Sequence, residues 1–205
     1  MEYIGILAIG YLIGSAPFGY TLAAVHGVKI GKVGSGSSGG TNIMRALGLK
    51  WGLLVMALDM AKGTVAVGAA LFLGHNWMVS AAVLFAVAFG HAYPVFLGFR
   101  GGGKSVSTIV GGMALLASWQ VFAVVLTIWL FVFLKQKLRK RFIMSFTNLA
   151  VLCPGIPIGL GISYLSPWAF LIGLGFSAFL CFTHRNNIKR LLRGEEEPLG
   201  IINRK

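Results

Sequence analysis

Long apolar segments constrain the fold of this chain more than any other feature of its sequence. A helix of about 20 apolar residues crosses a hydrocarbon core about 30 Å thick. Runs of about that length or more recur along the chain and cover residues 3–25, 51–73, 77–97, 106–134, 142–162 and 167–182. The sequence predicts an all-α polytopic membrane protein. We expect residues 1–205 to form one integral membrane domain, with residues 183–205 as a cytoplasmic tail.

The composition excludes the main soluble classes. Of the 205 residues, 57% are apolar and 11% are charged, whereas an average soluble chain has about 25% charged residues. A soluble domain of this size has too small an interior for that much apolar surface, so disorder, a coiled coil and an ordinary cytosolic enzyme are excluded. The net charge of +13 would indicate nucleic-acid binding in a soluble chain. In a membrane protein a positive charge indicates basic segments that orient the helices, contacts with anionic lipid headgroups or binding of an anionic substrate. We expect no nucleic-acid partner.

The distribution of basic residues predicts the topology. All 18 Lys and Arg residues except Lys62 lie in four polar segments, 26–50, 98–105, 135–141 and 183–205. Basic residues accumulate on the cytoplasmic side of membrane proteins. An N-terminus outside the membrane places all four segments in the cytoplasm, provided that two short helices, turning at Ser118–Gln120, cover residues 106–134. We expect seven membrane helices, two of them short, with the C-terminus inside.

Two charged residues lie inside the second apolar run. Asp59 and Lys62 are three residues apart and therefore share a helix face. Charges within a membrane helix are costly and usually pair or line a polar site, so this spacing favours a buried ion pair. His75 and His91 lie at opposite ends of the third run with no ligand-like grouping. We expect no metal ion and no organic cofactor.

The first polar segment contains a loop rich in glycine and serine. Residues 34–42 read GSGSSGGTN, and Arg45 follows. Glycines allow backbone N–H groups to close around an anion, and Thr41–Asn42 could open a helix whose N-terminus favours phosphate. Arg45 adds a forked donor. A flexible linker is the alternative interpretation of such a composition.

A second loop, residues 98–105, reads GFRGGGKS. It matches the nucleotide-binding pattern G-x-x-x-x-G-K-[ST]. The preceding segment is an apolar membrane run rather than a strand, and no α/β domain fits in the remaining residues, so an NTPase is excluded. Backbone amides with Arg100 and Lys104 still suit a phosphate group.

A third polar group follows the last apolar run. His184 and Asn187 share a helix face because they are three residues apart. The alternative is that this pair only caps the helix at the membrane interface. Residues 195–197, three consecutive glutamates, are expected to be solvated charge.

Taken together, the three loops resemble the bacterial membrane acyltransferases that acylate glycerol 3-phosphate with acyl-phosphate. The resemblance runs almost from end to end of the chain. The matching segments are Gly14-Ser15, Pro17-Phe18-Gly19, Gly34-Ser35-Gly36, Thr41-Asn42, Arg45-Ala46-Leu47-Gly48, Asp59, Lys62-Gly63, Gly90-His91, Pro94-Val95-Phe96, Gly98-Phe99, the glycine–lysine run, His184, Asn187-Ile188 and Arg190-Leu191-Leu192.

The resemblance implies an enzyme of the bacterial cytoplasmic membrane with its active site on the cytoplasmic side. It would transfer a fatty acyl group from acyl-phosphate to glycerol 3-phosphate and release 1-acyl-glycerol 3-phosphate and phosphate, the first acylation of phospholipid synthesis, among membrane phospholipids. The expected catalytic residues are Ser35, Arg45, Lys104, His184 and Asn187. The expected phosphate-binding and substrate-binding residues are Gly34, Gly36, Ser37, Gly40, Thr41, Asn42, Gly101, Gly102, Gly103, Ser105 and Thr147.

Several positions depart from the family's pattern. Ser37 stands where the family usually has Asn, and the run ending at Ser105 has an apparent extra glycine and lacks the usual glycine after the lysine. Met144 replaces the first of two usual hydroxyl residues, and Thr147 replaces the second. These departures motivate one alternative, a homologue with impaired catalysis that binds phosphorylated lipids or precursors. A transporter of small phosphate esters is the other alternative, although the sequence shows no repeats.

Overall fold

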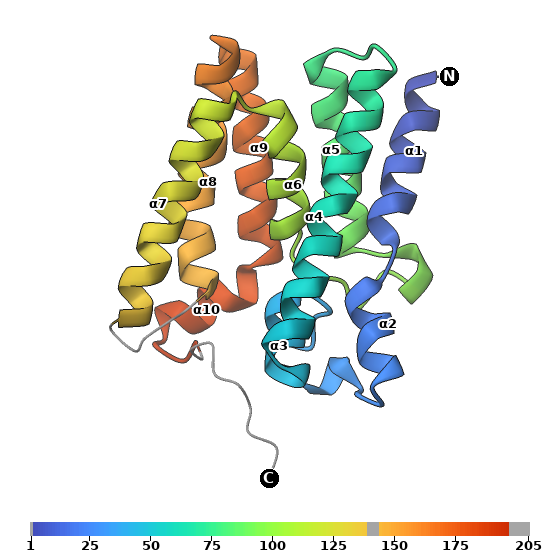
Figure 1. Cartoon of the computed structure of the whole chain (residues 1–205), viewed down its shortest axis with the longest axis vertical. Coiled ribbons are helices and arrows are strands. Elements are labelled where there is room, and N and C mark those ends of the chain that lie inside the picture. Colours follow the sequence, from blue (N-terminus) through green and yellow to red (C-terminus); the bar gives the residue numbers. More distant parts are fainter. Residues whose placement is uncertain (1, 139–143, 197–205) are drawn as a thin grey trace. The chain divides into compact units, whose positions relative to one another are not determined.

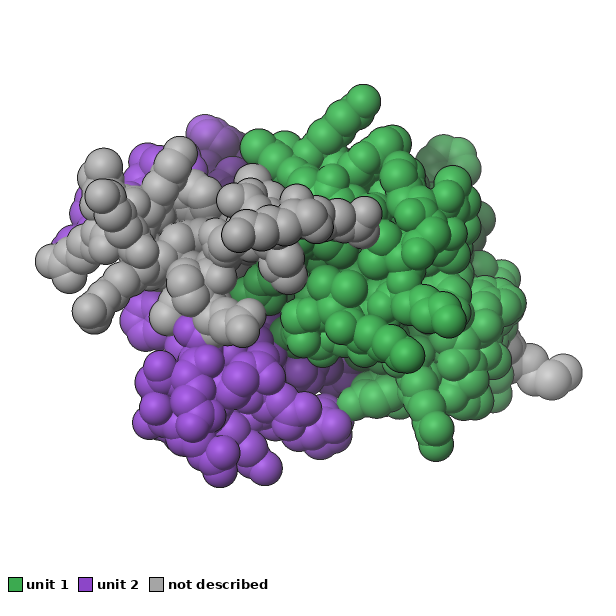
Figure 2. Space-filling view, turned by 90° about the horizontal axis from the view of Figure 1, so that it is seen from below, with its two compact units in different colours: residues 1–115, 200–205 green, residues 116–199 purple. Residues whose placement is uncertain are grey.

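The computed structural model describes residues 2–138 and 144–196, and the secondary structure of these residues is entirely helical. The chain divides into two compact units, one covering residues 1–115 and 200–205 and the other residues 116–199, which Figure 2 colours differently. The α-helices of the first unit are α1 (Glu2–Ser15), α2 (Phe18–Val25), α3 (Gly40–Leu47), α4 (Leu49–Phe72), α5 (Trp77–Ala92) and α6 (Val106–Leu116). Those of the second are α7 (Trp119–Leu138), α8 (Met144–Tyr164), α9 (Pro167–Thr183) and α10 (Arg185–Leu192).

In the first unit, α1, α4 and α5 pack side by side, and α2 and α3 lie at one end of them (Figure 1). Residues with small side chains allow the closest helix approaches. A Cβ built on Gly14 would overlap the backbone of Val87, and one built on Gly90 would overlap that of Tyr11. Close backbone contact of this kind is typical of membrane helices, where packing rather than the exclusion of water drives association.

Pro17 divides the first apolar segment into α1 and α2. Proline has no N–H and, inside a helix, removes a backbone hydrogen bond and kinks or breaks the helix. The interruption falls at Ala16 and Pro17, within the Gly–Ser–Pro sequence that interrupts this run. The consequence is a pair of backbone carbonyls, at Gly14 and Ala16, that are available to a side chain of a neighbouring helix.

In the second unit, α8 and α9 pack together, and α8 also contacts α7. Pro157 lies inside α8 and cannot donate to the carbonyl of Cys153 one turn earlier. Ser177 of α9 replaces that donor, because its Oγ donates to the Cys153 oxygen at 2.6 Å. Gly173 lies against the Pro157 ring and backbone, where a Cβ would have no room. Thus α9 supplies both the space and the hydrogen bond that the proline requires.

Within the described residues, four helical segments are long and apolar enough to cross a membrane, and a fifth results if α9 and α10, bent by 67°, count as one span. The apolar segments α6 and Trp119–Val132 are shorter. The expected turn is confirmed at residues 117–118, which overlap the predicted position at Ser118. Of the two helices expected to be short, α6 has 11 residues, but α7 has 20 and continues past residue 134 to Leu138. The number of seven spans and the orientation of the termini stay predictions, as does the single domain.

Two boundaries differ from those expected. The third run ends as an α-helix at Ala92 rather than at residue 97, because the residue before Pro94 is disfavoured in the α conformation. The expectation of a polar tail after residue 182 missed α10, whose polar composition hides it from a search for apolar runs. The basic residues 139–141 and 204–205 lie outside the described residues.

Candidate active site

Asn42 holds the first glycine-rich loop in shape. This side chain is 1% exposed, and its Oδ1 accepts a hydrogen bond from Ser35 N at 3.2 Å. Its Nδ2 donates to Val33 O at 2.9 Å and to Ser37 O at 2.8 Å. One buried amide on α3 therefore fixes both ends of the loop. We expected Asn42 to contact phosphate, and that role stays a prediction.

The loop brings two hydroxyl groups together and lies beside the Arg45 side chain. The Ser35 and Ser37 hydroxyls lie 2.9 Å apart. Gly34 and Gly36 have φ values of +48° and +69°, a region that side chains disfavour. A Cβ built on Gly34 would lie 3.5 Å from Arg45 Cδ, so the Arg45 side chain runs beside the loop. This arrangement places donors of the type that bind phosphate on one short segment.

Two further residues of the predicted set begin α3. Gly40 is the first residue of the helix, and a Cβ there would overlap the Met56 side chain of α4, so Gly40 permits the α3–α4 contact. Thr41 follows and is half-buried. The helix expected at Thr41–Asn42 is confirmed, with its start one residue earlier.

The second glycine-rich loop packs against the first. Ser38 N donates to Gly101 O at 3.2 Å, and a Cβ built on Gly39 would lie 3.8 Å from Gly103 Cα. The half-buried Lys104 follows directly. The segments carrying Ser35 and Lys104, distant in sequence, are thus neighbours within the first unit.

Ser105 adopts a backbone conformation that favours glycine. Its φ is +64°, which is uncommon for a residue with a side chain. The Ser105 hydroxyl is buried and donates to Ala88 O at 2.6 Å. This bond ties the loop to α5, and the predicted contact of Ser105 with substrate stays a prediction.

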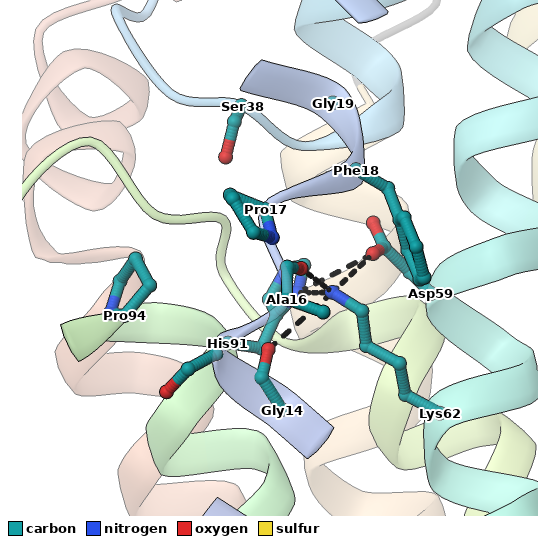
Figure 3. A pocket seen from close by; sticks show the side chains of 11 residues that line it. Gly14, Ala16, Pro17, Phe18, Gly19, Ser38, Asp59, Lys62, His91 and Pro94 are labelled. Carbon is teal, nitrogen blue, oxygen red and sulfur yellow. Dashed lines mark hydrogen bonds and ion pairs between the residues drawn. The ribbon is translucent and has the colours of Figure 1, made fainter. Parts of the chain in front are cut away.

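A buried charged cluster lies beneath these loops. Lys62 Nζ is 2.9 Å from Asp59 Oδ1, and both side chains are under 5% exposed, which confirms the predicted ion pair. Figure 3 shows the Lys62 ammonium group between Asp59 and the α1–α2 break, where it donates to Ala16 O at 2.6 Å and Gly14 O at 3.3 Å. A cavity of about 10 Å³ beside the cluster, room for about one water molecule, is also lined by Ser38.

His91 of α5 completes this cluster. Its Nδ1 lies 3.5 Å from Asp59 Oδ1 and 3.4 Å from Lys62 Nζ. This association was not predictable from the sequence, because 29 residues separate His91 from Lys62 and no spacing rule joins two different helices. The only available signal was that all three residues are polar and lie within or at the end of apolar runs.

In the second unit, His184 lies between α9 and α10 and is 2% exposed. Its Nδ1 lies 2.8 Å from Leu180 O. A carbonyl oxygen only accepts, so Nδ1 carries the hydrogen. Thr147, another predicted residue, is fully buried in α8.

Asn187 is held by a carboxylate. Its Nδ2 donates to Glu196 Oε1 at 2.6 Å and to Ser145 Oγ at 2.8 Å. Ser145 Oγ also donates to Glu196 Oε1 at 2.7 Å, and Arg190 Nε donates to Glu196 Oε2 at 2.6 Å. A carboxylate only accepts hydrogen bonds. The donor Nδ2 of Asn187 therefore faces Glu196, and Oδ1 is directed away from it.

The expectation that residues 195–197 are solvated charge is wrong for Glu196, which is 7% exposed. Burial raises the pKa of its carboxyl, but the hydrogen bonds from Ser145, Arg190 and Asn187, with the Arg190 charge, outweigh burial and hold the pKa below its ordinary value. Glu195 is exposed, as expected, and Glu197 lies outside the described residues.

The predicted residues thus form two groups. Ser35, Arg45 and Lys104 belong to the first unit, whereas His184 and Asn187 belong to the second. Each group is described within its own unit. Among the residues that the structure describes, no cluster of three or more His, Cys, Asp or Glu side chains could hold a metal ion.

Comparisons with known proteins agree along the whole chain. The sequence model of the family described as glycerol-3-phosphate acyltransferase matches residues 4–194. The glycerol-3-phosphate acyltransferase of Anaeromyxobacter dehalogenans (strain 2CP-C) is 41% identical over 199 residues, covering 95% of this chain and 96% of the relative. That of Synechococcus sp. (strain JA-2-3B'a(2-13)) is 38% identical over 192 residues, covering 93% of this chain and 92% of the relative.

Two solved structures are similar as well. The crystal structure of PlsY (YgiH), an integral membrane glycerol 3-phosphate acyltransferase, in its glycerol 3-phosphate form has a TM-score of 0.86 and 33% identity, covering 98% of this chain and 96% of that one. Its lysophosphatidic acid form has a TM-score of 0.83 and 31% identity, covering 98% and 97% of the two chains.

Proposed function

The chain belongs to the glycerol-3-phosphate acyltransferase family of integral membrane enzymes, and from that premise we propose that its acyl donor is an acyl-phosphate. The proposed products are 1-acyl-glycerol 3-phosphate and inorganic phosphate. The solved relative has forms with glycerol 3-phosphate and with lysophosphatidic acid, which are the acceptor and the acylated product of this reaction. The observation that carries the proposal is the contact between the Ser35 loop and the Lys104 loop through Ser38 N and Gly101 O.

Acyl-phosphate is a mixed anhydride and already contains a good leaving group. The glycerol hydroxyl oxygen attacks the acyl carbon, an ester C–O bond forms, and the bond from that carbon to the phosphate oxygen breaks. The phosphate departs with the electron pair and accepts the hydroxyl proton. No step requires a nucleophilic side chain, so we propose direct transfer without an acyl-enzyme.

Arg45 and Lys104 hold the substrate phosphates in this proposal. Both substrates are anionic, and bringing two anions together requires positive charge and N–H donors at fixed positions. Ser35 and the N–H groups of its glycine-rich loop orient the acyl-phosphate. Holding the reactants in this way supplies much of the rate enhancement, up to roughly 7–11 kcal/mol in favourable cases.

His184 and Asn187 act on the acceptor. Because Nδ1 donates to Leu180 O, the neutral form of His184 that we propose for the reaction has its lone pair at Nε2. The Asn187 Oδ1 is an acceptor directed away from Glu196, because Nδ2 binds the carboxylate. Acceptors at both positions suit a hydroxyl group better than a phosphate, so we assign this pair to the glycerol hydroxyls.

We further propose seven membrane helices in the bacterial cytoplasmic membrane, with the N-terminus outside and the active site on the cytoplasmic side. The basic residues support this orientation through their concentration in alternate polar segments. Single-cysteine labelling checks it: residues 26–50 and 98–105 should react only with a reagent that enters the cell.

The activity is tested with purified protein, labelled glycerol 3-phosphate and palmitoyl-phosphate. We expect labelled lysophosphatidate with release of one phosphate per product, and none with the Lys104→Gln variant. Parallel reactions with palmitoyl-CoA and palmitoyl-acyl carrier protein test the donor. Product from either of these but not from palmitoyl-phosphate would overturn the proposed donor. Uptake of labelled glycerol 3-phosphate by donor-free proteoliposomes, without product, would support a transporter instead.

A further inference from the structure

The loop that carries Lys104 is held by the buried cluster through one side chain. We propose that His91 is a positioning residue. Its imidazole, which Asp59 and Lys62 hold in place, determines where the backbone of residues 101–104 lies. The catalytic consequence rests on the proposed function, in which Lys104 holds a substrate phosphate.

The imidazole is fixed on its Nδ1 side. Asp59 Oδ1 and Lys62 Nζ lie 3.5 Å and 3.4 Å from Nδ1. Lys62 is itself held by Asp59 and by the carbonyls of Gly14 and Ala16. The ring is 8% exposed and thus has little freedom to rotate.

The other edge of the ring supports the loop. A Cβ built on Gly103 would overlap His91 Nε2 and lie 2.8 Å and 2.9 Å from Cε1 and Cδ2, so the Gly103 backbone lies directly on the imidazole. Gly103 N also donates to the backbone oxygen of His91 at 3.0 Å. The residue that follows is Lys104, and any displacement at Gly103 is transmitted to it through a single peptide unit.

The three glycines of this loop are required for different reasons. Gly103 has an ordinary φ, so its requirement for glycine comes from the His91 side chain rather than from its backbone. At Gly102 a Cβ would overlap the backbone oxygens of Ala92 and His91. At Gly101 a Cβ would meet nothing within 4 Å, and the constraint is instead its φ of +71°. The run of three glycines therefore contains three different constraints.

These differences permit a double-mutant cycle with a matched control. His91→Ala removes the ring that excludes a Cβ at position 103, but leaves the backbone oxygens that exclude a Cβ at position 102. The variants are Gly103→Ala, His91→Ala and the pair, with Gly102→Ala in both backgrounds as the control. Binding of labelled glycerol 3-phosphate, the KM and kcat of transfer, and the melting temperature in detergent are measured for each.

We expect Gly103→Ala to weaken glycerol 3-phosphate binding by about tenfold or more in the native background, since misplacement by about 1 Å has large effects on catalytic geometry. In the His91→Ala background, Gly103→Ala should change the affinity for glycerol 3-phosphate by less than about twofold, which is within the error of additivity. Gly102→Ala should be equally harmful in both backgrounds. Equal effects of Gly103→Ala in both backgrounds, or none in the native protein, would overturn the proposal.

The cycle separates this inference from the proposed function. If Lys104→Gln leaves glycerol 3-phosphate binding unchanged, the phosphate role of Lys104 fails. The His91–Gly103 coupling would then still be read from the melting temperatures, where the double variant should be more stable than the two single effects predict. Additive melting temperatures would refute the contact itself.

Discussion

Lys62 Nζ lies 2.6 Å from the carbonyl oxygen of Ala16, the residue next to the proline that breaks the first apolar segment. One ammonium group therefore joins α4 to the break between α1 and α2 and also neutralises Asp59. The break is stabilised by a charge that is itself paired, which keeps the low-dielectric surroundings free of an isolated ion.

Lys62→Met should strongly destabilise the protein. The change leaves the buried Asp59 carboxylate without its cation and leaves the Ala16 carbonyl with only its hydrogen bond from Phe18 N, and breaking a buried pair in this way costs about 3–5 kcal/mol. Thermal unfolding in detergent measures the effect. Lys50→Met, in the same helix but exposed, is the control and should change stability by less than about 0.5 kcal/mol. Equal stability of the two variants would contradict the pairing.

Asn42→Asp should impair glycerol 3-phosphate binding, because aspartate cannot donate to Val33 O and Ser37 O. We expect roughly a tenfold loss, together with destabilisation by about 1–3 kcal/mol from the unsatisfied buried carbonyls. Asn76→Asp is the matched control, since Asn76 only accepts hydrogen bonds, from Met78 N and Val79 N, and aspartate caps a helix equally well. Unchanged binding in the Asn42 variant would refute its role in shaping the loop.

Ser177→Ala should destabilise the second unit by about 1–2 kcal/mol, since the Cys153 carbonyl loses its donor. In a Pro157→Ala background the helix regains an N–H for that carbonyl. In that background Ser177→Ala should reduce the free energy of unfolding by measurably less. The unfolding midpoints of the native protein, the two single variants and the double variant measure the difference. An identical cost in both backgrounds would show that the serine does not compensate for the proline.

Glu196→Gln should change the acid stability of the protein. Its pKa in the folded protein lies below the ordinary value of 4.5, so the carboxylate contributes stability above that value and the contribution is lost as the pH falls through the folded pKa. The difference in melting temperature between the native protein and Glu196→Gln should be constant near neutral pH and shrink below about pH 4.5.

Glu195→Gln, at an exposed neighbouring site, supplies the control and should show no such pH-dependent difference. Because Glu196 also orients Asn187, its replacement should lower kcat as well, whereas Glu195→Gln should not. A pH-independent difference for Glu196→Gln would contradict the hydrogen-bonded carboxylate.

Local spacing predicted some contacts and not others. The Asp59–Lys62 pair was predictable because two residues three positions apart on one helix share a face. His91 was not, because its position beside that pair depends on the packing of α5 on α4. The glycine–serine loop was recognisable from composition, but the use of both polar ends of the Asn42 amide for the loop backbone depends on a three-dimensional turn that no residue pattern encodes.

The C-terminal segment shows the same limit. Apolar periodicity locates α9, but α10 and the burial of Glu196 depend on the 67° bend after His184. That bend directs a polar helix along α8 and buries a carboxylate among Ser145, Asn187 and Arg190. Three adjacent glutamates look equivalent in a sequence, and only the path of the backbone distinguishes the buried one.

The three hydrogen bonds of Asn42 also bear on when the proposed anion-binding loop becomes ordered. Fixing the backbone of a residue opposes binding by about 1–2 kcal/mol in conformational entropy, and a glycine-rich segment has the most freedom to lose. Here folding has already restricted the segment from Val33 to Ser37 before any ligand arrives. In the proposed reaction, the free energy of phosphate binding is therefore not spent on ordering the loop, and more of it remains for lowering the activation barrier.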